Sequence, residues 1–153
     1  AWMRAGLDGP LQFTSFEAYP MRPEDMAQAH AAFPALDGRR DALTAAWDGT
    51  GGVLELPGLR AEIIIGDARQ ALPAWQGQVD AWFLDGFSPA KNPELWGDAL
   101  MAEVARHTAP SGTAATYTAA GFVRRALGAG GFEVTRIPGY GRKRHMTRAQ
   151  MPV

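Results

Sequence analysis

The feature that most constrains the fold is an alternation of short apolar segments with segments that carry helix start and stop residues. Residues typical of strands are expected at 11–18, 53–56, 59–65, 79–84, 113–117, 133–137 and 144–148. Helical segments are expected at 22–33, 39–47, 68–72, 93–107 and 121–127. This alternation predicts an α/β fold with an open, mostly parallel sheet and helices on both faces.

The length and composition narrow the class of protein. A chain of 153 residues, 46% of them hydrophobic, is enough for one core, so we expect a single domain, 1–153. The absence of cysteine excludes disulfides, cysteine zinc sites and thiol nucleophiles, and suits a cytoplasmic protein. His30, His107 and His145 show no ligand spacing, so we expect no metal. No apolar run is long enough to span a bilayer, and no secretory leader opens the chain, so we expect no membrane association.

Charge is divided unevenly along the chain. Residues 1–105 carry seven Lys or Arg against fifteen Asp or Glu, whereas residues 106–153 carry eight against one. A basic end of this kind indicates either a phosphate-binding surface or ordinary solvated faces, and charge alone does not distinguish the two.

Three acidic residues each follow an expected strand. They are Glu17, Asp67 and Asp85. Because ligands of open α/β sheets bind beyond the carboxyl ends of the strands, these three carboxylates are candidates for a binding site. The alternatives are a solvated strand end for Glu17 and a turn for Asp67.

The segment 80–96, DAWFLDGFSPAKNPELW, is the most informative in the chain. An apolar strand delivers Asp85 to a Gly-Phe turn, followed by a proline-stiffened loop with two aromatic residues, Phe87 and Trp96. A carboxylate can orient an amine for attack on a methyl group, and aromatic rings can hold a flat base. The structural alternative is that Asp85 caps a turn while Phe87 and Trp96 fill the core.

Three blocks in order carry a family resemblance. FLDGFSPAKNPELW (83–96), TYTAAGFVRR (116–125) and GYGRKRHM (139–146) closely resemble the methyltransferase module of the MnmC and MnmD family. The resemblance extends from about Gln12 to Met146 and is weakest between residues 35 and 58. It implies a Rossmann-like, S-adenosylmethionine-dependent methyltransferase. The implied reaction methylates the aminomethyl amine of the modified wobble uridine in tRNA, giving 5-methylaminomethyl-2-thiouridine.

The resemblance also implies roles for individual residues. Glu17 matches the acid that binds the cofactor ribose, and Asp67 with Ala68 matches the position that reads the adenine edge. Asp85 matches the residue that faces the methyl-transfer centre, which makes it a cofactor contact and the main catalytic residue. The residues that would line the base pocket are Phe87, Pro89 and Lys91.

The basic end gains a role from the same resemblance. The residues expected to hold the tRNA backbone are Arg124, Arg125, Arg142, Lys143 and Arg144. We expect Arg106, Arg136 and Arg148 to be ordinary solvated arginines. The family further implies an FAD-dependent oxidase module as a partner, either fused or separate.

One departure from the family pattern is serious. The fold ordinarily has a first strand followed by a glycine-rich loop around the cofactor, and nothing before Leu11 supplies either. We therefore expect a fragment that lacks the first strand and is inactive by itself. Two alternatives stay open: a nicotinamide-dependent oxidoreductase, which needs a GxGxxG loop that is not evident, and a non-catalytic RNA-binding fragment.

Overall fold

The computed structural model describes residues 5–153, with Asp37 described by its backbone alone. The strands are β1 (Leu11–Glu17), β2 (Gly52–Leu56), β3 (Leu59–Ile65), β4 (Val79–Phe83), β5 (Thr108–Thr116), β6 (Glu133–Pro138) and β7 (His145–Gln150). The α-helices are α1 (Pro23–Ala31), α2 (Asp37–Ala46), α3 (Ala68–Ala74), α4 (Asp98–Arg106) and α5 (Gly121–Ala129), and two short 3₁₀ helices are η2 (Pro34–Leu36) and η3 (Pro93–Trp96). The chain divides into two compact units at Ala71/Leu72, and each is described by itself.

The first unit contains a three-stranded sheet in the order β1-β3-β2. β1 pairs with β3 in parallel, and β2 pairs with β3 in antiparallel orientation. Its core is formed by Trp47, Leu54 and Ala61, with Met26 and Leu43 packed against them. Burial of these side chains, worth about 1.5–3 kcal/mol for each large one, joins the amphipathic helices to the sheet.

The turn between α2 and β2 requires a glycine. Gly51 has a φ of 82°, a conformation that costs other residues strain. A Cβ there would lie 2.8 Å from the carbonyl oxygen of Ile63 and 2.7 Å from the side chain of Ile65. The close approach lets β2 start directly beside β3, where Gly52 pairs with Ile63.

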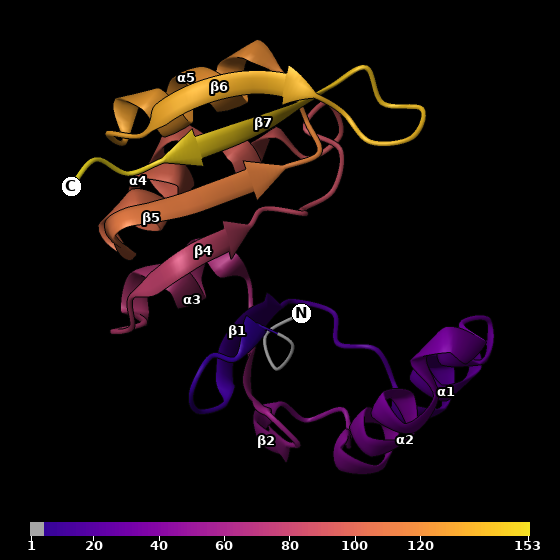
Figure 1. Cartoon of the computed structure of the whole chain (residues 1–153). Helices are drawn as coiled ribbons and strands as arrows, with labels where there is room; N and C mark the ends of the chain where they lie inside the picture. The colour runs from indigo at the N-terminus through magenta and orange to yellow at the C-terminus, as the bar shows by residue number, and fades with distance from the viewer. Residues whose placement is uncertain (1–4) are drawn as a thin grey trace. The chain divides into compact units, whose positions relative to one another are not determined.

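The second unit contains a four-stranded sheet in the order β4-β5-β7-β6 (Figure 1). α4 and α5 lie together behind this sheet (Figure 1), and most of the unit's buried residues come from these two helices and from β5 and β7. These buried residues include Leu100, Met101, Val104, Val123, Ala126, Leu127, Ala114 and Ala149. One apolar face on each element therefore builds a core of ordinary two-layer α/β type.

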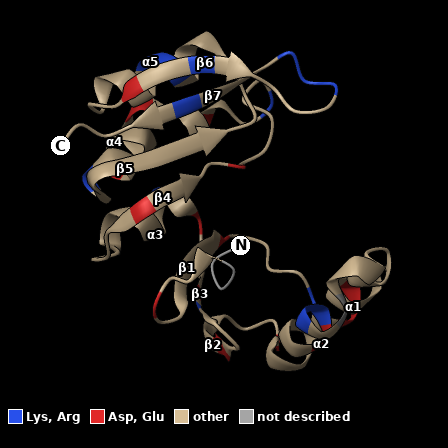
Figure 2. Cartoon of the chain, viewed as in Figure 1, with Lys and Arg blue, Asp and Glu red and all other residues tan. Residues whose placement is uncertain are grey.

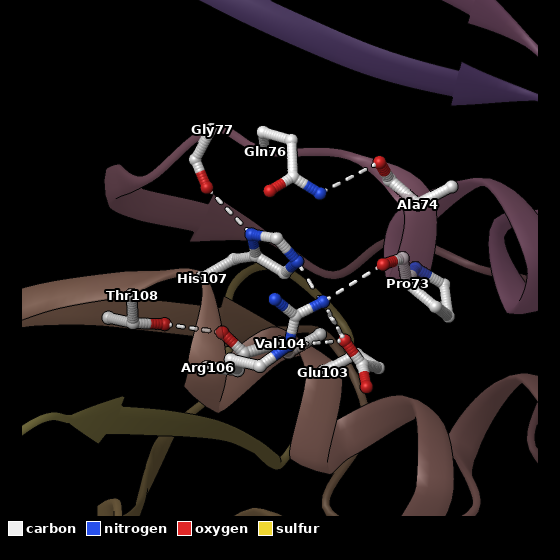
Figure 3. Close-up of polar contacts among 9 residues, drawn as sticks. All are labelled: Pro73, Ala74, Gln76, Gly77, Glu103, Val104, Arg106, His107 and Thr108. Carbon is white, nitrogen blue, oxygen red and sulfur yellow. Dashed lines mark hydrogen bonds and ion pairs between the residues drawn. The ribbon is translucent and has the colours of Figure 1, made fainter.

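A polar network joins the end of α4 to the segment that leads into β4 (Figure 3). The ring of His107 is 3% exposed, and its Nδ1 lies 2.6 Å from the carbonyl oxygen of Gly77. Because a carbonyl only accepts, Nδ1 carries the hydrogen. Arg106 pairs with Glu103 and donates to the carbonyl oxygen of Pro73 at 3.1 Å. The network lies at the end where β4 and β5 begin, opposite the end that carries Asp85.

The α/β class and the order of the elements agree with the expectation, but the strand pairing is mixed rather than mostly parallel. β1–β3 and β4–β5 are parallel, while β2–β3, β5–β7 and β6–β7 are antiparallel. The reason is the length of the connections. Only Pro57-Gly58 joins β2 to β3, and six residues, 139–144, join β6 to β7. A parallel crossover needs a dozen residues or more.

Two element boundaries also differ from the expectation. The expected helix 93–107 begins instead as η3 and is interrupted at Gly97, which is extended and precedes α4. β5 starts at Thr108 rather than 113, because Val79 pairs with Thr108 while Ala81 pairs with Thr113. Residues 109–112 therefore form a bulge, and their turn-type residues disguise the strand start.

Candidate functional site

Two of the acidic candidates lie at one edge of the first unit's sheet. Glu17 is the last residue of β1 and pairs with Ile65, the last residue of β3. The Gly66 N–H donates to the Glu17 carbonyl oxygen at 3.0 Å, and Asp67 follows directly. The parallel register therefore brings the carboxylates of Glu17 and Asp67 to the same carboxyl edge.

Asp67 is held by its own turn. Its Oδ1 accepts the backbone N–H of Arg69 at 2.9 Å, and the Arg69 guanidinium donates to both carboxylate oxygens. Ala68 starts α3 beside it. The Arg69 side chain, and then its backbone N–H, lower the pKa of the Asp67 carboxyl to about 2. The turn that sequence reasoning weighed as an alternative is thus present, and it fixes an ionised carboxylate at the edge.

Glu17 is less constrained. Its side chain is exposed, and Oε1 accepts a hydrogen bond from the Ser15 hydroxyl at 2.5 Å. An ionised carboxylate has about four acceptor positions on two oxygens. The second oxygen is therefore able to accept hydrogen bonds from two neighbouring hydroxyl groups of a ligand.

Asp85 lies in the second unit, on a turn fixed through its backbone. The Leu84 N–H donates to Ala115 O at 2.9 Å, which extends the β4–β5 pairing to the residue before Asp85. The Tyr117 hydroxyl donates to the Gly86 carbonyl oxygen at 2.8 Å. The Asp85 side chain is exposed, so a rigid backbone presents a carboxylate to solvent at the carboxyl end of β4.

The two aromatic residues of the loop after β4 differ in how far their side chains are buried. Trp96 is 1% exposed, and its Nε1 donates to the Phe87 carbonyl oxygen at 2.8 Å, so it belongs to the core. Phe87 is 72% exposed. Pro89 is buried and Lys91 is exposed, and the backbone N–H of Lys91 donates to Ser88 O at 2.9 Å. Of the three base-pocket candidates in this loop, Phe87 and Lys91 are therefore available at the surface and Pro89 is not.

Tyr117 was not predicted from the sequence as a site residue. It lies just beyond β5, and its ring meets Trp96 edge to face with centroids 6.2 Å apart. The Nζ atom of Lys143 lies 5.0 Å from the Tyr117 ring centroid. One indication was available: β4 and β5 were both expected strands, and a polar aromatic residue after one meets the carboxylate after the other if they pair in parallel.

The basic candidates occupy two places. Arg142, Lys143 and Arg144 lie in the exposed loop 139–144 between β6 and β7, which Figure 2 shows as a continuous basic stretch. β6 runs parallel to β4 and β5 because it pairs antiparallel with β7, which pairs antiparallel with β5. The loop therefore lies at the same edge as Asp85.

Arg124 differs from the loop cations. It lies in α5, is half-buried, and its Nε is buried without a hydrogen-bond partner among the residues described. Arg125 is exposed in the same helix. A guanidinium nitrogen that is buried without a hydrogen-bond partner lowers the stability of the fold, which argues against Arg124 as an ordinary solvated arginine.

The candidates divide between the two units. Glu17, Asp67 and Ala68 belong to the first unit, whereas Asp85 and the basic residues belong to the second. Among residues 5–153, no group of three or more His, Asp or Glu is arranged to hold a metal ion. No helix in this part of the chain is long and apolar enough to cross a membrane.

Comparison with known proteins identifies relatives of this chain. Residues 41–152 match a family described as S-adenosyl-L-methionine-dependent methyltransferase. The chain is 42% identical over 151 residues to the tRNA 5-methylaminomethyl-2-thiouridine biosynthesis bifunctional protein MnmC of Chromobacterium violaceum, covering 94% of this chain and 23% of that protein. It is 45% identical over 149 residues to the protein of the same name from Pseudomonas savastanoi pv. phaseolicola, covering 94% and 23%. The chain thus spans about a quarter of the length of the curated relatives it matches.

Solved structures agree on the fold. The crystal structure of MNMC2 from Aquifex aeolicus superposes with a TM-score of 0.68 at 21% identity, covering 99% of this chain and 58% of that one. The antibiotic-resistance methyltransferase Kmr gives a TM-score of 0.53 at 13% identity, covering 99% and 91%. At these identities the likeness shows a Rossmann-like methyltransferase fold and nothing finer.

Proposed function

The chain belongs to the family of S-adenosyl-L-methionine-dependent methyltransferases, and we propose that it methylates the aminomethyl amine of the modified wobble uridine of tRNA. The product is 5-methylaminomethyl-2-thiouridine, the compound in the names of the relatives at 42–45% identity. The observation that carries the proposal is the exposed Asp85 carboxylate on a backbone fixed by Tyr117 and Trp96, beside the exposed ring of Phe87.

The proposed chemistry needs little from the protein beyond placement. The bound cofactor supplies a methyl group on a sulfonium, which is already a strong donor. Asp85 would accept a hydrogen bond from the substrate amine and so orient the nitrogen lone pair towards the methyl group. The amine nitrogen forms the new bond to that methyl carbon as the bond from carbon to sulfur breaks, and the proton that the nitrogen loses passes to the exposed Asp85 carboxylate and on to solvent. Alignment of two reactants contributes as much as about 7–11 kcal/mol in well-oriented cases, so one rigid carboxylate suffices.

For the cofactor we propose the carboxyl edge of the first unit. Glu17 accepts hydrogen bonds from the ribose hydroxyls, and Asp67 with Ala68 meets the adenine edge. Asp67 is ionised over the whole neutral range, which suits an acceptor of the adenine amine. Arg69 engages both Asp67 oxygens, so cofactor binding exchanges or shares one of those contacts.

For the RNA we propose that Phe87 and Lys91 contact the base while buried Pro89 stiffens their loop. Arg124, Arg142 and Arg144 contact the phosphate backbone, and Lys143, which the sequence placed in the same group, lies between the two loop arginines. Phosphate contacts of this kind make binding fall steeply with salt. An RNA substrate also favours a cytoplasmic protein.

We propose further that the working domain includes a first strand and glycine-rich loop in addition to these residues. Among residues 5–153, β1 and β4 are each paired on one side only within their own sheets, which leaves room for a further strand. The relatives are named bifunctional, and we assign the second activity to an FAD-dependent oxidase module outside this chain.

The test is a methyl-transfer assay with labelled cofactor and tRNA carrying the aminomethyl group, on the chain extended at its amino end. We expect transfer by the parent and none by Asp85→Ala, with tRNA affinity largely kept. The chain without the extension should give no heat on titration with S-adenosylmethionine. Unchanged turnover of Asp85→Ala refutes its catalytic role, and a nicotinamide nucleotide as the bound ligand refutes the proposal as a whole.

The family assignment favours this reading over the nicotinamide-dependent oxidoreductase. A non-catalytic RNA-binding chain is separated by the same assay, because it binds tRNA but transfers no methyl group even when extended.

A further inference from the structure

The loop between β6 and β7 has a defined conformation. The Gly139 N–H donates to Arg144 O and the Lys143 N–H to Tyr140 O, each at 3.2 Å. A Cβ at Gly139 would overlap the carbonyl group of Lys143, and Gly141 has a φ of 61°. Both glycines are therefore required for this turn, which closes tightly and projects from the sheet.

Tyr140 is at the tip of this turn and is 93% exposed. A single exposed aromatic residue is common on protein surfaces and needs no explanation by itself. Here three consecutive cations, Arg142 to Arg144, follow it within four residues. An exposed π face among guanidinium groups is the surface that unpaired nucleic-acid bases and their phosphates fit.

Lys143 differs from its two neighbours. Its ammonium lies 5.0 Å from the Tyr117 ring centroid, within the range of a cation–π interaction. The hydroxyl of Tyr117 donates to Gly86 O, next to Asp85. Lys143 thus connects the loop to the turn that carries Asp85, and Tyr140 projects from the same edge.

We propose that Tyr140 stacks on an unpaired base of an RNA loop, that Arg142 and Arg144 bind the flanking phosphates, and that Lys143 positions the loop through Tyr117. This inference rests on the proposed function for its RNA substrate. It adds Tyr140 as a residue that stacks on a base, and it gives Lys143 a positioning role instead of a phosphate contact. RNA loops expose bases in this way, whereas paired bases are hidden from a tyrosine ring.

Stacking and phosphate binding respond differently to salt. A phosphate contact releases counterions, so its loss lowers the slope of log affinity against log salt by about 0.7 for single strands. A stacking contact releases no counterion. Its loss lowers affinity by roughly 5- to 150-fold at every salt concentration, the equivalent of about 1–3 kcal/mol per stacked base.

The experiment measures anisotropy of a fluorescein-labelled RNA hairpin with a uridine-rich single-stranded loop, over a series of salt concentrations. We expect Tyr140→Ala to weaken binding with an unchanged salt slope, and Tyr140→Phe to bind as the parent does. Arg142→Ala should reduce the slope. Arg136→Ala, an exposed arginine on β6, is the matched charge control and should leave affinity within twofold.

Two results overturn the inference: Tyr140→Ala binding as tightly as the parent, or Tyr140→Phe losing as much affinity as Tyr140→Ala. Either leaves the proposed function intact if methyl transfer to tRNA continues. Conversely, absence of methyl transfer by the extended parent counts against the proposed function, while the stacking contact is still decided by the binding data. For Lys143, a salt slope reduced as much by Lys143→Ala as by Arg142→Ala contradicts its positioning role.

Discussion

Replacing Tyr117 with Phe tests whether a single hydrogen bond fixes the Asp85 turn. The substitution removes only the hydroxyl, which donates to Gly86 O at 2.8 Å. The ring stays, and with it the edge contact to Trp96 and the cation–π contact of Lys143. Any effect on Asp85 therefore passes through the Gly86 carbonyl group.

The expected magnitude follows from that bond. A neutral hydrogen bond contributes about 0.5–1.5 kcal/mol net, and Tyr117 is half-buried, so water can replace part of it. We expect the free energy of unfolding to fall by about 1 kcal/mol. If the same 1 kcal/mol shifts the equilibrium away from the conformation that places Asp85 correctly, kcat falls by roughly fivefold, since 1.36 kcal/mol corresponds to tenfold. The KM for the cofactor should change much less than kcat, because the proposed ribose and adenine contacts, Glu17 and Asp67, are untouched.

The assay is steady-state methyl transfer by the extended chain, with urea unfolding in parallel. Tyr19→Phe is the control, because it removes a hydroxyl from a ring that is 90% exposed and should change neither quantity. A loss of stability with unchanged kcat refutes the reasoning, since the turn is then held by other contacts. A loss of more than about a hundredfold refutes it in the other direction, because one positioning bond cannot account for it.

Two further predictions concern stability. Arg69 lowers the pKa of the Asp67 carboxyl from 3.8 to about 2, so the ionised carboxylate contributes stability that is present above pH 3.8 and lost as the pH falls through about 2. Asp67→Asn should therefore reduce the pH dependence of the free energy of unfolding, measured in urea, over that window. An unchanged pH profile contradicts the role of the Arg69 contact. Leu127 is 1% exposed, so Leu127→Ala should cost about 2–5 kcal/mol, against less than about 0.5 for Leu36→Ala, whose side chain is 45% exposed; equal costs would contradict the core assignment.

The sequence predicts local structure better than pairing. The spacing of apolar residues locates the strands, because a strand buries every second residue whereas a helix buries every third or fourth. β3, for example, is found at the expected 59–65. Pairing direction depends on connection length and on which strands become neighbours, so the antiparallel insertion of β7 between β5 and β6 was not evident. The start of β5 was missed because residues 109–112 bulge out of the ladder.

In the candidate site, too, local features could be predicted from the sequence, whereas contacts between distant residues could not. That Asp85 follows a strand was readable from the apolar run before it, but the burial that this run suggested is wrong for the residues described, because β4 is an edge strand and Phe83 is 78% exposed. Which of Phe87 and Trp96 is available was not readable, because both are aromatic residues in one loop, and only packing buries Trp96 and leaves Phe87 72% exposed. The role of Tyr117 could not be predicted for a related reason. Its hydroxyl forms a hydrogen bond with Gly86, 31 positions earlier in the sequence, and the local sequence does not predict contacts between the ends of different strands.

Topology, rather than charge, separates the basic residues that lie near the Asp85 edge from those that do not. Arg106 is paired with Glu103 at the end opposite Asp85, and Arg136 and Arg148 lie within strands. The loop 139–144 lies at the Asp85 edge because β6 runs parallel to β4 and β5 and therefore ends at that edge. We therefore expect Arg142 and Arg144, which lie in this loop, to contact RNA, and substitutions at Arg106 or Arg148 should leave RNA affinity unchanged where Arg142→Ala weakens it.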